Sequence, residues 1–269
     1  MTTACYAVFG QPIAHSLSPR IHAAFGAQFG MAIDYRAIEA GRGELSAALD
    51  AFAHSGGRGA NATLPLKEDA ALLCASLSER AQRCGSVNTL IRDGDRWQGD
   101  STDGIGLLRD LARQAFDPHE KRVLMLGAGG AARAAVFALA GAGARELVIA
   151  NRTLARAQSL ADAVGARAGA WEGLAPESPF DLVVNATAAG HADIPLDLPR
   201  TLITPSTVCY DLSYGSAARS FLDWARAGGA VRAGDGLGML VEQAAESFSL
   251  WHGRHPDTGP VHALLRAGS

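Results

Sequence analysis

Residues 121–153, KRVLMLGAGGAARAAVFALAGAGARELVIANRT, decide the fold of the second half of the chain. An apolar run, a glycine turn, an alanine-rich segment and a second apolar run follow one another at the length of a βαβ unit. Gly127-Ala128-Gly129-Gly130-Ala131-Ala132 fits G-x-G-x-x-G/A, where the first glycine makes the turn, the second admits a pyrophosphate and a small third residue lets helix approach strand. The stretch therefore predicts a Rossmann dinucleotide-binding domain, with a tight turn that binds nothing as the alternative.

The end of the second apolar run indicates which dinucleotide is bound. An NAD-binding protein usually has an acid there for the ribose 2′-hydroxyl, whereas this chain reads Ala150-Asn151-Arg152-Thr153. A guanidinium can bind a 2′-phosphate bidentately, and a carboxylate would repel it. If a helix begins near Thr153, Arg156 can reach the same side of the turn as Arg152. NADP is therefore favoured over NAD, and two solvated arginines are the alternative.

Two further apolar runs, at 180–190 and 207–214, extend the parallel sheet. The carboxyl ends of strands form the ligand crevice of such a sheet, so Thr187, Ala188 and Tyr214 are expected along it. Residues 234–253 combine a glycine-rich turn with a long amphipathic helix. They come too late for another Rossmann crossover, and we expect them to return to the first domain.

The first half also alternates strand and helix patterns, which is typical of an α/β fold. We expect strands at 6–10, 34–40 and 59–64, helices at 19–30, 44–56, 67–77 and 102–116, and a hairpin at 86–100 around Asp93-Gly94. Asp117-Pro118 is expected to close the last helix. The expected domains are residues 1–103, completed by 237–269, and residues 104–236.

Composition excludes several classes of function. The chain has 269 residues, 48% hydrophobic and 19% charged, with a net charge of −3 and no basic block. We therefore expect a small-molecule ligand rather than nucleic acid or a membrane. The chain has neither a secretory signal pattern nor an apolar run of spanning length, so a cytoplasmic location is expected. The scattered cysteines, Cys5, Cys74, Cys84 and Cys209, are expected to be buried without disulfides, and His252 with His255 is too weak a pair to predict a metal.

Several motifs occur in one order along the chain: YAVFGQPIAHSLSPRIH, GANATLPLKE, VNT, GDSTDGIGLL, GAGGAAR, NRT, NAT and DGLGMLVEQAA with LWHG. On these motifs the chain resembles the shikimate dehydrogenase family from end to end. The resemblance implies an α/β N-terminal substrate domain and a doubly wound Rossmann NADP-binding domain, with the active site in the cleft between them. It implies reversible reduction of 3-dehydroshikimate to shikimate with NADPH, in aromatic amino-acid and chorismate biosynthesis, by a monomer or homodimer.

The resemblance also assigns a catalytic pair, Lys67 and Asp103. Hydride leaves a ring carbon while the attached hydroxyl loses a proton, and without a metal a side chain must hold that proton. Lys67 would be the acid/base and Asp103 would orient it. A lysine after a proline-containing turn is usually on the surface, which is the alternative for Lys67 alone.

The remaining site residues are implied by the same matches. Ser16 and Ser18 correspond to ligands of the substrate carboxylate, and Asn61, Thr63, Asn88 and Gln243 to ligands of the ring hydroxyls, with Tyr214 also on the substrate side. Ser18, ahead of Pro19, has the alternative of a helix cap. The cofactor positions are Gly127, Gly129, Gly130, Ala131, Asn151, Arg152, Thr153, Arg156, Thr187, Leu212, Gly236 and Met239.

The chain departs from the family pattern at Ala62, Leu66, Ser101 and Ala188-Ala189. A paralogue acting on quinate or another cyclic polyol acid therefore stays open. Two other classes also stay open: a non-catalytic dinucleotide-binding regulator, and a Rossmann enzyme with unrelated chemistry. The regulator would be expected to have lost Lys67 or Asp103, and both are present.

Overall fold

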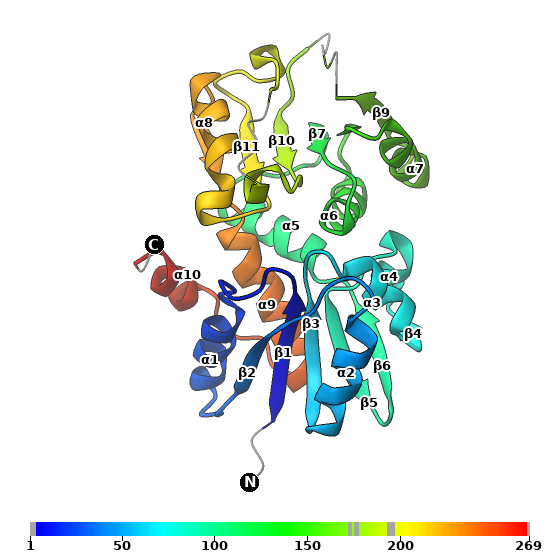
Figure 1. Ribbon diagram of the computed structural model, residues 1–269. Helices are drawn as coiled ribbons and strands as arrows, with labels where there is room; N and C mark the ends of the chain where they lie inside the picture. The colour runs from blue at the N-terminus through cyan, green and yellow to red at the C-terminus, as the bar shows by residue number, and fades with distance from the viewer. Residues whose placement is uncertain (1–3, 172–173, 175–177, 193–196, 268–269) are drawn as a thin grey trace. The chain divides into compact units, whose positions relative to one another are not determined.

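The computed structural model describes residues 4–171, 174, 178–192 and 197–267 (Figure 1). It divides into two compact units, Met1–Gly106 with Leu240–Ser269, and Leu107–Met239. The last helices therefore belong to the first unit, as expected. The expected boundaries after residues 103 and 236 stay a prediction.

The first unit contains a six-stranded mixed sheet. Its strands are β1 (Cys5–Gly10), β2 (Asp34–Glu39), β3 (Gly57–Ala62), β4 (Ser76–Leu77), β5 (Thr89–Asp93) and β6 (Arg96–Asp100), in the order β2-β1-β3-β5-β6-β4. β1 is parallel to β2 and β3, while β5 is antiparallel to β3 and β6. The hairpin predicted around Asp93-Gly94 is confirmed as β5–β6.

Helices cover both faces of this sheet. They are α1 (Ser18–Gln28), α2 (Leu45–His54), α3 (Lys67–Leu73), α4 (Glu79–Cys84), the start of α5 (Asp103–Arg113), most of α9 (Leu237–His252) and α10 (Gly259–Arg266). Because side chains alternate along a strand, Phe9 of β1 packs with Phe52 of α2, while Tyr6 packs against Trp251 of α9. Figure 1 shows α2 and α9 on opposite sides of the sheet.

The second unit is a doubly wound Rossmann fold. Its strands are β7 (Arg122–Leu126), β8 (Glu146–Asn151), β9 (Arg167–Ala170), β10 (Leu182–Asn185), β11 (Val208–Asp211) and β12 (Arg232–Gly234). All neighbours are parallel, in the order β12-β11-β10-β7-β8-β9. This order reverses between β7 and β10, where such folds bind dinucleotides.

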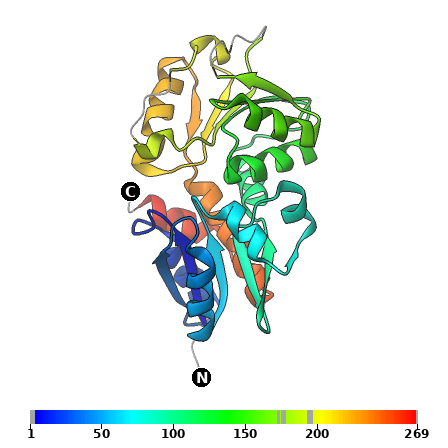
Figure 2. The ribbon, with the colours of Figure 1, turned by 45° about the vertical axis from the view of Figure 1, so that its right-hand side comes forward.

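Two apolar cores lie on the two faces of the parallel sheet. Its helices are α6 (Gly130–Gly141), α7 (Leu154–Val164), α8 (Arg219–Ala227) and the end of α5, with short 3-10 turns at Ala189–Ala192, Arg200–Leu202 and Gly215–Ala218. Val184 and Tyr210 point to the core with α5, α6 and α7, whereas Val183 and Cys209 point to the core with α8. Figure 2 shows α6 and α7 on one side of this sheet and α8 on the other.

Two predicted helices are too long. The helix expected over 67–77 ends at Leu73, because Cys74 is extended and Ser76–Leu77 pairs with β6. The helix expected over 102–116 ends at Arg113, ahead of Ala115, whose φ is +54°. Of the four cysteines expected to be buried, Cys84 and Cys209 are buried, whereas Cys5 and Cys74 are partly exposed.

Candidate functional site

Lys67 and Asp103 form an ion pair within the first unit. Each is the first residue of a helix, Lys67 of α3 and Asp103 of α5. The side chains are only 13% and 5% exposed, respectively, and Lys67 Nζ donates directly to Asp103 Oδ2. Interpretation of Lys67 as a solvated surface lysine is therefore wrong.

Asn88 connects this pair to Gln243. Its Oδ1 accepts the backbone N–H of Thr102 at 2.7 Å, which fixes the orientation of the amide. Its Nδ2 consequently lies 3.2 Å from Asp103 Oδ1 and 2.9 Å from Gln243 Oε1. The two Asp103 oxygens therefore face donors on both sides, Lys67 Nζ at Oδ2 and Asn88 Nδ2 at Oδ1.

Asn61 lies in a second part of the same buried network. Its Nδ2 donates to Asn88 O at 2.9 Å and approaches Ser247 Oγ at 3.1 Å, while its Oδ1 accepts from Tyr35 OH at 2.7 Å. Burial raises the pKa of Tyr35, so that hydroxyl stays protonated and can donate. The contacts use both N–H groups of Asn61 and leave it one oxygen lone pair.

Sequence reasoning assigned no role to four members of this network: Tyr35, Thr89, Thr102 and Ser247. Thr89 and Thr102 do lie inside the motifs VNT and GDSTDG, next to Asn88 and Asp103. Ser247 follows Gln243 by one helical turn of α9 and donates to its carbonyl at 3.1 Å. The three hydroxyls of Thr89, Thr102 and Ser247 are fully buried and lie within hydrogen-bond distance of one another.

The two serines expected at the carboxylate adjoin each other at the start of α1. Ser18 N donates to Ser16 Oγ at 3.3 Å, and Ser18 is 5% exposed. The alternative of Ser18 as the helix cap is wrong, because Leu17 occupies the cap position. Thr63 is partly exposed and follows β3, with its N–H bonded to Phe9 O. Tyr214 is the one expected substrate ligand that belongs to the second unit.

The glycine turn of the second unit fits a pyrophosphate. Gly127 has φ +108°, and a Cβ there would lie 2.9 Å from Ala186 O. A Cβ on Gly129 would meet nothing within 4 Å, so the backbone before Gly130 and Ala131 is open. These residues start the 12-residue helix α6, whose first N–H groups favour an anion.

The segment after β8 presents two cations. Arg152 and Arg156 are exposed and have no ion pair within the part of the chain that the structure describes. Asn151 Nδ2 donates to Thr153 O at 3.0 Å, and α7 starts directly after Thr153, as expected. The arrangement leaves both guanidinium groups available to a phosphate.

The ends of β10 and β11 bring together the remaining expected cofactor positions. Leu212 N donates to Asn185 O at 2.8 Å, and Thr187 Oγ1 donates to Asn185 Oδ1 at 2.8 Å. A Cβ on Gly236 would lie 2.3 Å from Leu212 O, so only glycine fits there. Met239 N donates to Tyr210 OH at 3.2 Å.

Asp211 lies at the same strand ends and was not predicted as a site residue. It is fully buried, and its Oδ2 and Oδ1 accept from Asn185 Nδ2 and Ser213 N, both at 2.7 Å. Burial raises the pKa of Asp211 to about 6, against the lowering effect of these hydrogen bonds.

The described residues contain neither a metal-binding cluster nor a membrane span. No group of three or more His, Cys, Asp and Glu side chains in the described ranges is arranged to hold a metal ion. Within the same residues, every helix is too short or too polar to cross a membrane.

The chain is 54% identical over 270 residues to a protein of Stenotrophomonas maltophilia named shikimate dehydrogenase (NADP(+)), covering 98% of this chain and 96% of that one. The chain belongs to the shikimate dehydrogenase family. Family models agree: residues 8–90 match the shikimate dehydrogenase substrate binding domain, 110–197 match shikimate / quinate 5-dehydrogenase, and 236–266 match the shikimate 5'-dehydrogenase C-terminal domain.

Solved structures extend this relationship to the fold. Shikimate 5-dehydrogenase from Thermus thermophilus, in complex with NADP(H) and shikimate, has a TM-score of 0.86 and 36% identity, covering 99% of this chain and 100% of that one. An Ael1 enzyme from Pseudomonas putida has a TM-score of 0.88 and 40% identity, covering 97% and 98%. The two-domain fold predicted for the shikimate dehydrogenase family is thereby confirmed.

Proposed function

We propose that this chain catalyses the reversible NADP-dependent reduction of 3-dehydroshikimate to shikimate, a step of aromatic amino-acid biosynthesis. The observation that carries the proposal is the Lys67–Asp103 ion pair, which is largely shielded from solvent and is connected through Asn88 to Gln243. A relative that is 54% identical to this chain is named shikimate dehydrogenase (NADP(+)).

Lys67 is proposed to move the proton. When NADPH is bound it supplies a hydride, and the protein must then protonate the oxygen of the reduced carbonyl. The ammonium of Lys67 has three N–H donors, of which Asp103 takes one. A remaining N–H can donate to the substrate oxygen, and the neutral amine takes the proton back in the oxidative direction. Asp103 holds Nζ in place by accepting its hydrogen bond.

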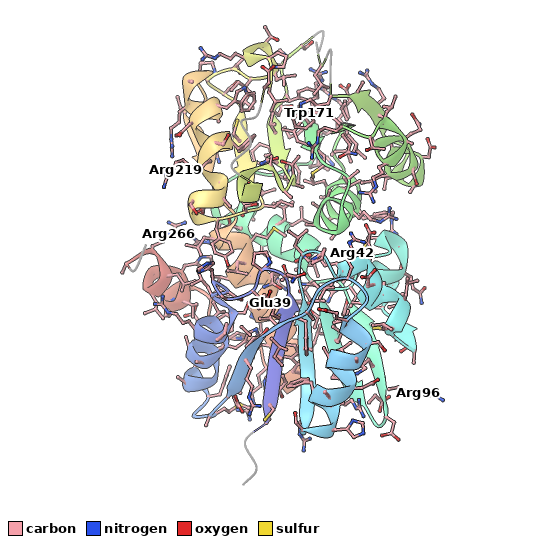
Figure 3. All side chains as sticks on the ribbon, in the orientation of Figure 1. Glu39, Arg42, Arg96, Trp171, Arg219 and Arg266 are labelled. Atoms are coloured by element: carbon pink, nitrogen blue, oxygen red, sulfur yellow. The ribbon has the colours of Figure 1, made fainter. Side chains whose placement is uncertain are left out.

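The lysine content of the chain supports a chemical role for Lys67. Only Lys67 and Lys121 are lysines among 24 Lys and Arg residues. Arginine supplies the surface cations, such as Arg96 and Arg219, which are exposed and extended in Figure 3. Arginine does not lose its proton in proteins, whereas lysine can act as an acid and a base.

The neighbouring polar side chains suit a polyol acid. We assign Ser16 and Ser18 to the carboxylate and Thr63, Asn88 and Gln243 to ring hydroxyls, with Asn61 and Tyr214 as further expected ligands. Gln243 Nε2 donates one N–H to Leu240 O at 2.9 Å, and its other N–H can donate to a ligand. Hydroxyl and amide groups bind such a substrate without burying a further charge.

The second unit fits NADP. Gly127, Gly129, Gly130 and Ala131 are assigned to the pyrophosphate, since a Cβ at Gly129 would meet nothing within 4 Å and the backbone there is open to a ligand. Asn151, Arg152, Thr153 and Arg156 are assigned to the adenosine phosphate, and Thr187, Leu212, Gly236 and Met239 to the nicotinamide side. The exposed guanidinium groups of Arg152 and Arg156 favour NADP over NAD.

The proposed activity also implies the binding partners, the location and the oligomeric state of the protein. The partners are a small-molecule substrate and NADP, and we propose a cytoplasmic monomer or homodimer.

One assay tests the activity and its main alternative together. NADPH and NADH formation is followed with shikimate and with quinate as substrates. Fastest NADPH formation with shikimate supports the proposal, and fastest turnover of quinate supports the paralogue that Ala62, Leu66 and Ala188-Ala189 leave open. Binding of NADP with turnover of neither acid would favour the regulator.

A further inference from the structure

The ends of β10 and β11 carry a buried pair, Asn185 and Asp211. They are the last residues of the two strands and lie directly opposite each other in the register. Because side chains alternate along strands, both residues point to the same face as Val183 and Cys209, the face towards α8. The exposed fraction is 2% for Asn185 and 0% for Asp211.

The hydrogen bonds around this pair have a fixed direction. Asn185 Oδ1 accepts the backbone N–H of Thr187 at 3.2 Å, so its Nδ2 must face Asp211, where the distance is 2.7 Å. Asp211 accepts on its other oxygen from Ser213 N at 2.7 Å. A carboxylate can serve both donors because it is an acceptor on each oxygen.

Three expected cofactor segments meet at this pair. The Gly127 turn adjoins it, because a Cβ at Gly127 would lie 2.9 Å from Ala186 O and 3.3 Å from Thr187 N. Thr187 itself is bound through Asn185. On the other side Ser213 O accepts from Gly236 N at 2.8 Å.

We propose that Asp211 is a positioning residue for NADP, which acts through Asn185 on Thr187 and through Ser213 on Gly236. Asp211 makes no contact with the cofactor in this proposal. Its carboxylate sets the direction of the hydrogen bonds that hold these loops, and it leaves the lone pairs of Thr187 Oγ1 free to accept. The inference rests on the proposed use of NADP and adds a residue to which the family motifs assign no role.

A supporting observation is that the pair retains a buried charge. Burial raises the pKa of Asp211 to about 6, so the carboxylate is ionised at neutral pH although its environment disfavours the charge. Strongly perturbed groups of this kind concentrate at functional sites.

The test exchanges the two residues. In Asp211→Asn an amide N–H must face either the Asn185 amide or Ser213 N, which places donor against donor. In Asn185→Asp two carboxylates face each other. The double variant Asn185→Asp/Asp211→Asn restores every bond, because Asp at 185 accepts from Thr187 and from the new amide, whose oxygen accepts from Ser213 N.

The measurement is the Kd of NADP on the free protein, by fluorescence titration, with thermal unfolding as a check of folding. Each single variant should weaken NADP binding by about tenfold or more, because it loses one or two buried hydrogen bonds. The double variant should recover most of the lost NADP affinity. Asp181→Asn is the matched control: Asp181 precedes β10 at its opposite end and accepts from Arg122 N at 2.8 Å.

The inference would be overturned by an exchanged variant that binds NADP no more tightly than the single variants, or by an equal loss of NADP affinity in Asp181→Asn. The single variants keeping the wild-type Kd with only a lower melting temperature would also overturn it. Failure of the proposed function is distinguishable, because wild-type protein would then not bind NADP, or would bind it without turning over shikimate.

Discussion

Replacing Lys67 tests whether the buried ion pair transfers a proton or only stabilises the fold. Lys67→Met removes the ammonium and leaves Asp103, which is 5% exposed, with the Asn88 amide at 3.2 Å as its side-chain donor. Loss of general acid/base catalysis should lower kcat by about 10² to 10⁴, or roughly 3 to 5 kcal/mol in the barrier. Breaking a buried pair should also cost stability, up to about 3 to 5 kcal/mol.

Lys67→Arg separates the two effects. Arginine can keep the charge pair with Asp103, so stability should recover at least in part, but it cannot give up its proton and kcat should stay low. The assay is kcat and KM for shikimate with NADP, together with the Kd of NADP and the melting temperature. The Kd of NADP should barely change in either variant, because its proposed ligands lie in the other unit.

Lys121→Met serves as the matched control, since Lys121 is the second lysine of the chain and lies outside the proposed site. It should keep wild-type kcat. Wild-type turnover in Lys67→Arg, or in Lys67→Met, would refute the assignment of the proton to Lys67.

Four further results are expected. Arg152→Asp should weaken NADP far more than NAD, by about 2 to 4 kcal/mol, and Arg156→Ala should cost less; an unchanged NADP/NAD ratio, or equal losses at the two positions, would contradict this in kinetic measurements. Ser16→Ala should raise the KM for shikimate by a factor that corresponds to about 1 to 3 kcal/mol of binding free energy, with little change in kcat; a fall in kcat alone would count against the carboxylate contact. Burial raises the pKa of Asp211 to about 6, so NADP affinity should fall more steeply below pH 6 in the wild type than in Asp211→Asn, where only the 2′-phosphate of NADP titrates near that pH; equal slopes in a pH titration of Kd would contradict this. Burial lowers the pKa of His22 to about 3, so the free energy of unfolding should fall as the pH drops below the unfolded value of about 6.5, by about 2 kcal/mol at pH 5; the same acid slope in urea unfolding of His22→Phe would exclude this residue as its cause.

The Rossmann unit could be predicted because its central strands are apolar apart from their terminal residues and its turn needs glycine. Three of the elements that were missed, β9, β12 and α4, lack such a signal. β9 reads RAGA and β12 reads RAG, so these short edge strands are defined by pairing with β8 and β11 rather than by an apolar run. The short helix α4 has six residues, too few for a clear period. In α8, Phe221 and Ala225 do have helical spacing, so this element was missed although its signal was present.

The site residues also divide into those that could be predicted from the sequence and those that could not. Resemblance supplied Lys67 and Asp103, but they are 36 residues apart, and only the fold of the first unit brings them into contact. Tyr35 was missed because its role depends on where β2 places its hydroxyl against Asn61. Asp211 was missed because its hydrogen bonds depend on the register of β10 and β11, which cannot be predicted from the sequence.

The most direct test of the central claim is the reductive reaction with its product identified. Purified protein is incubated with NADPH and either 3-dehydroshikimate or 3-dehydroquinate, NADPH consumption is followed by absorbance, and the product is identified by NMR. We expect shikimate as the product and a higher kcat/KM for 3-dehydroshikimate than for 3-dehydroquinate. No consumption of NADPH with 3-dehydroshikimate, or an equal or higher kcat/KM with 3-dehydroquinate, would contradict the proposed function.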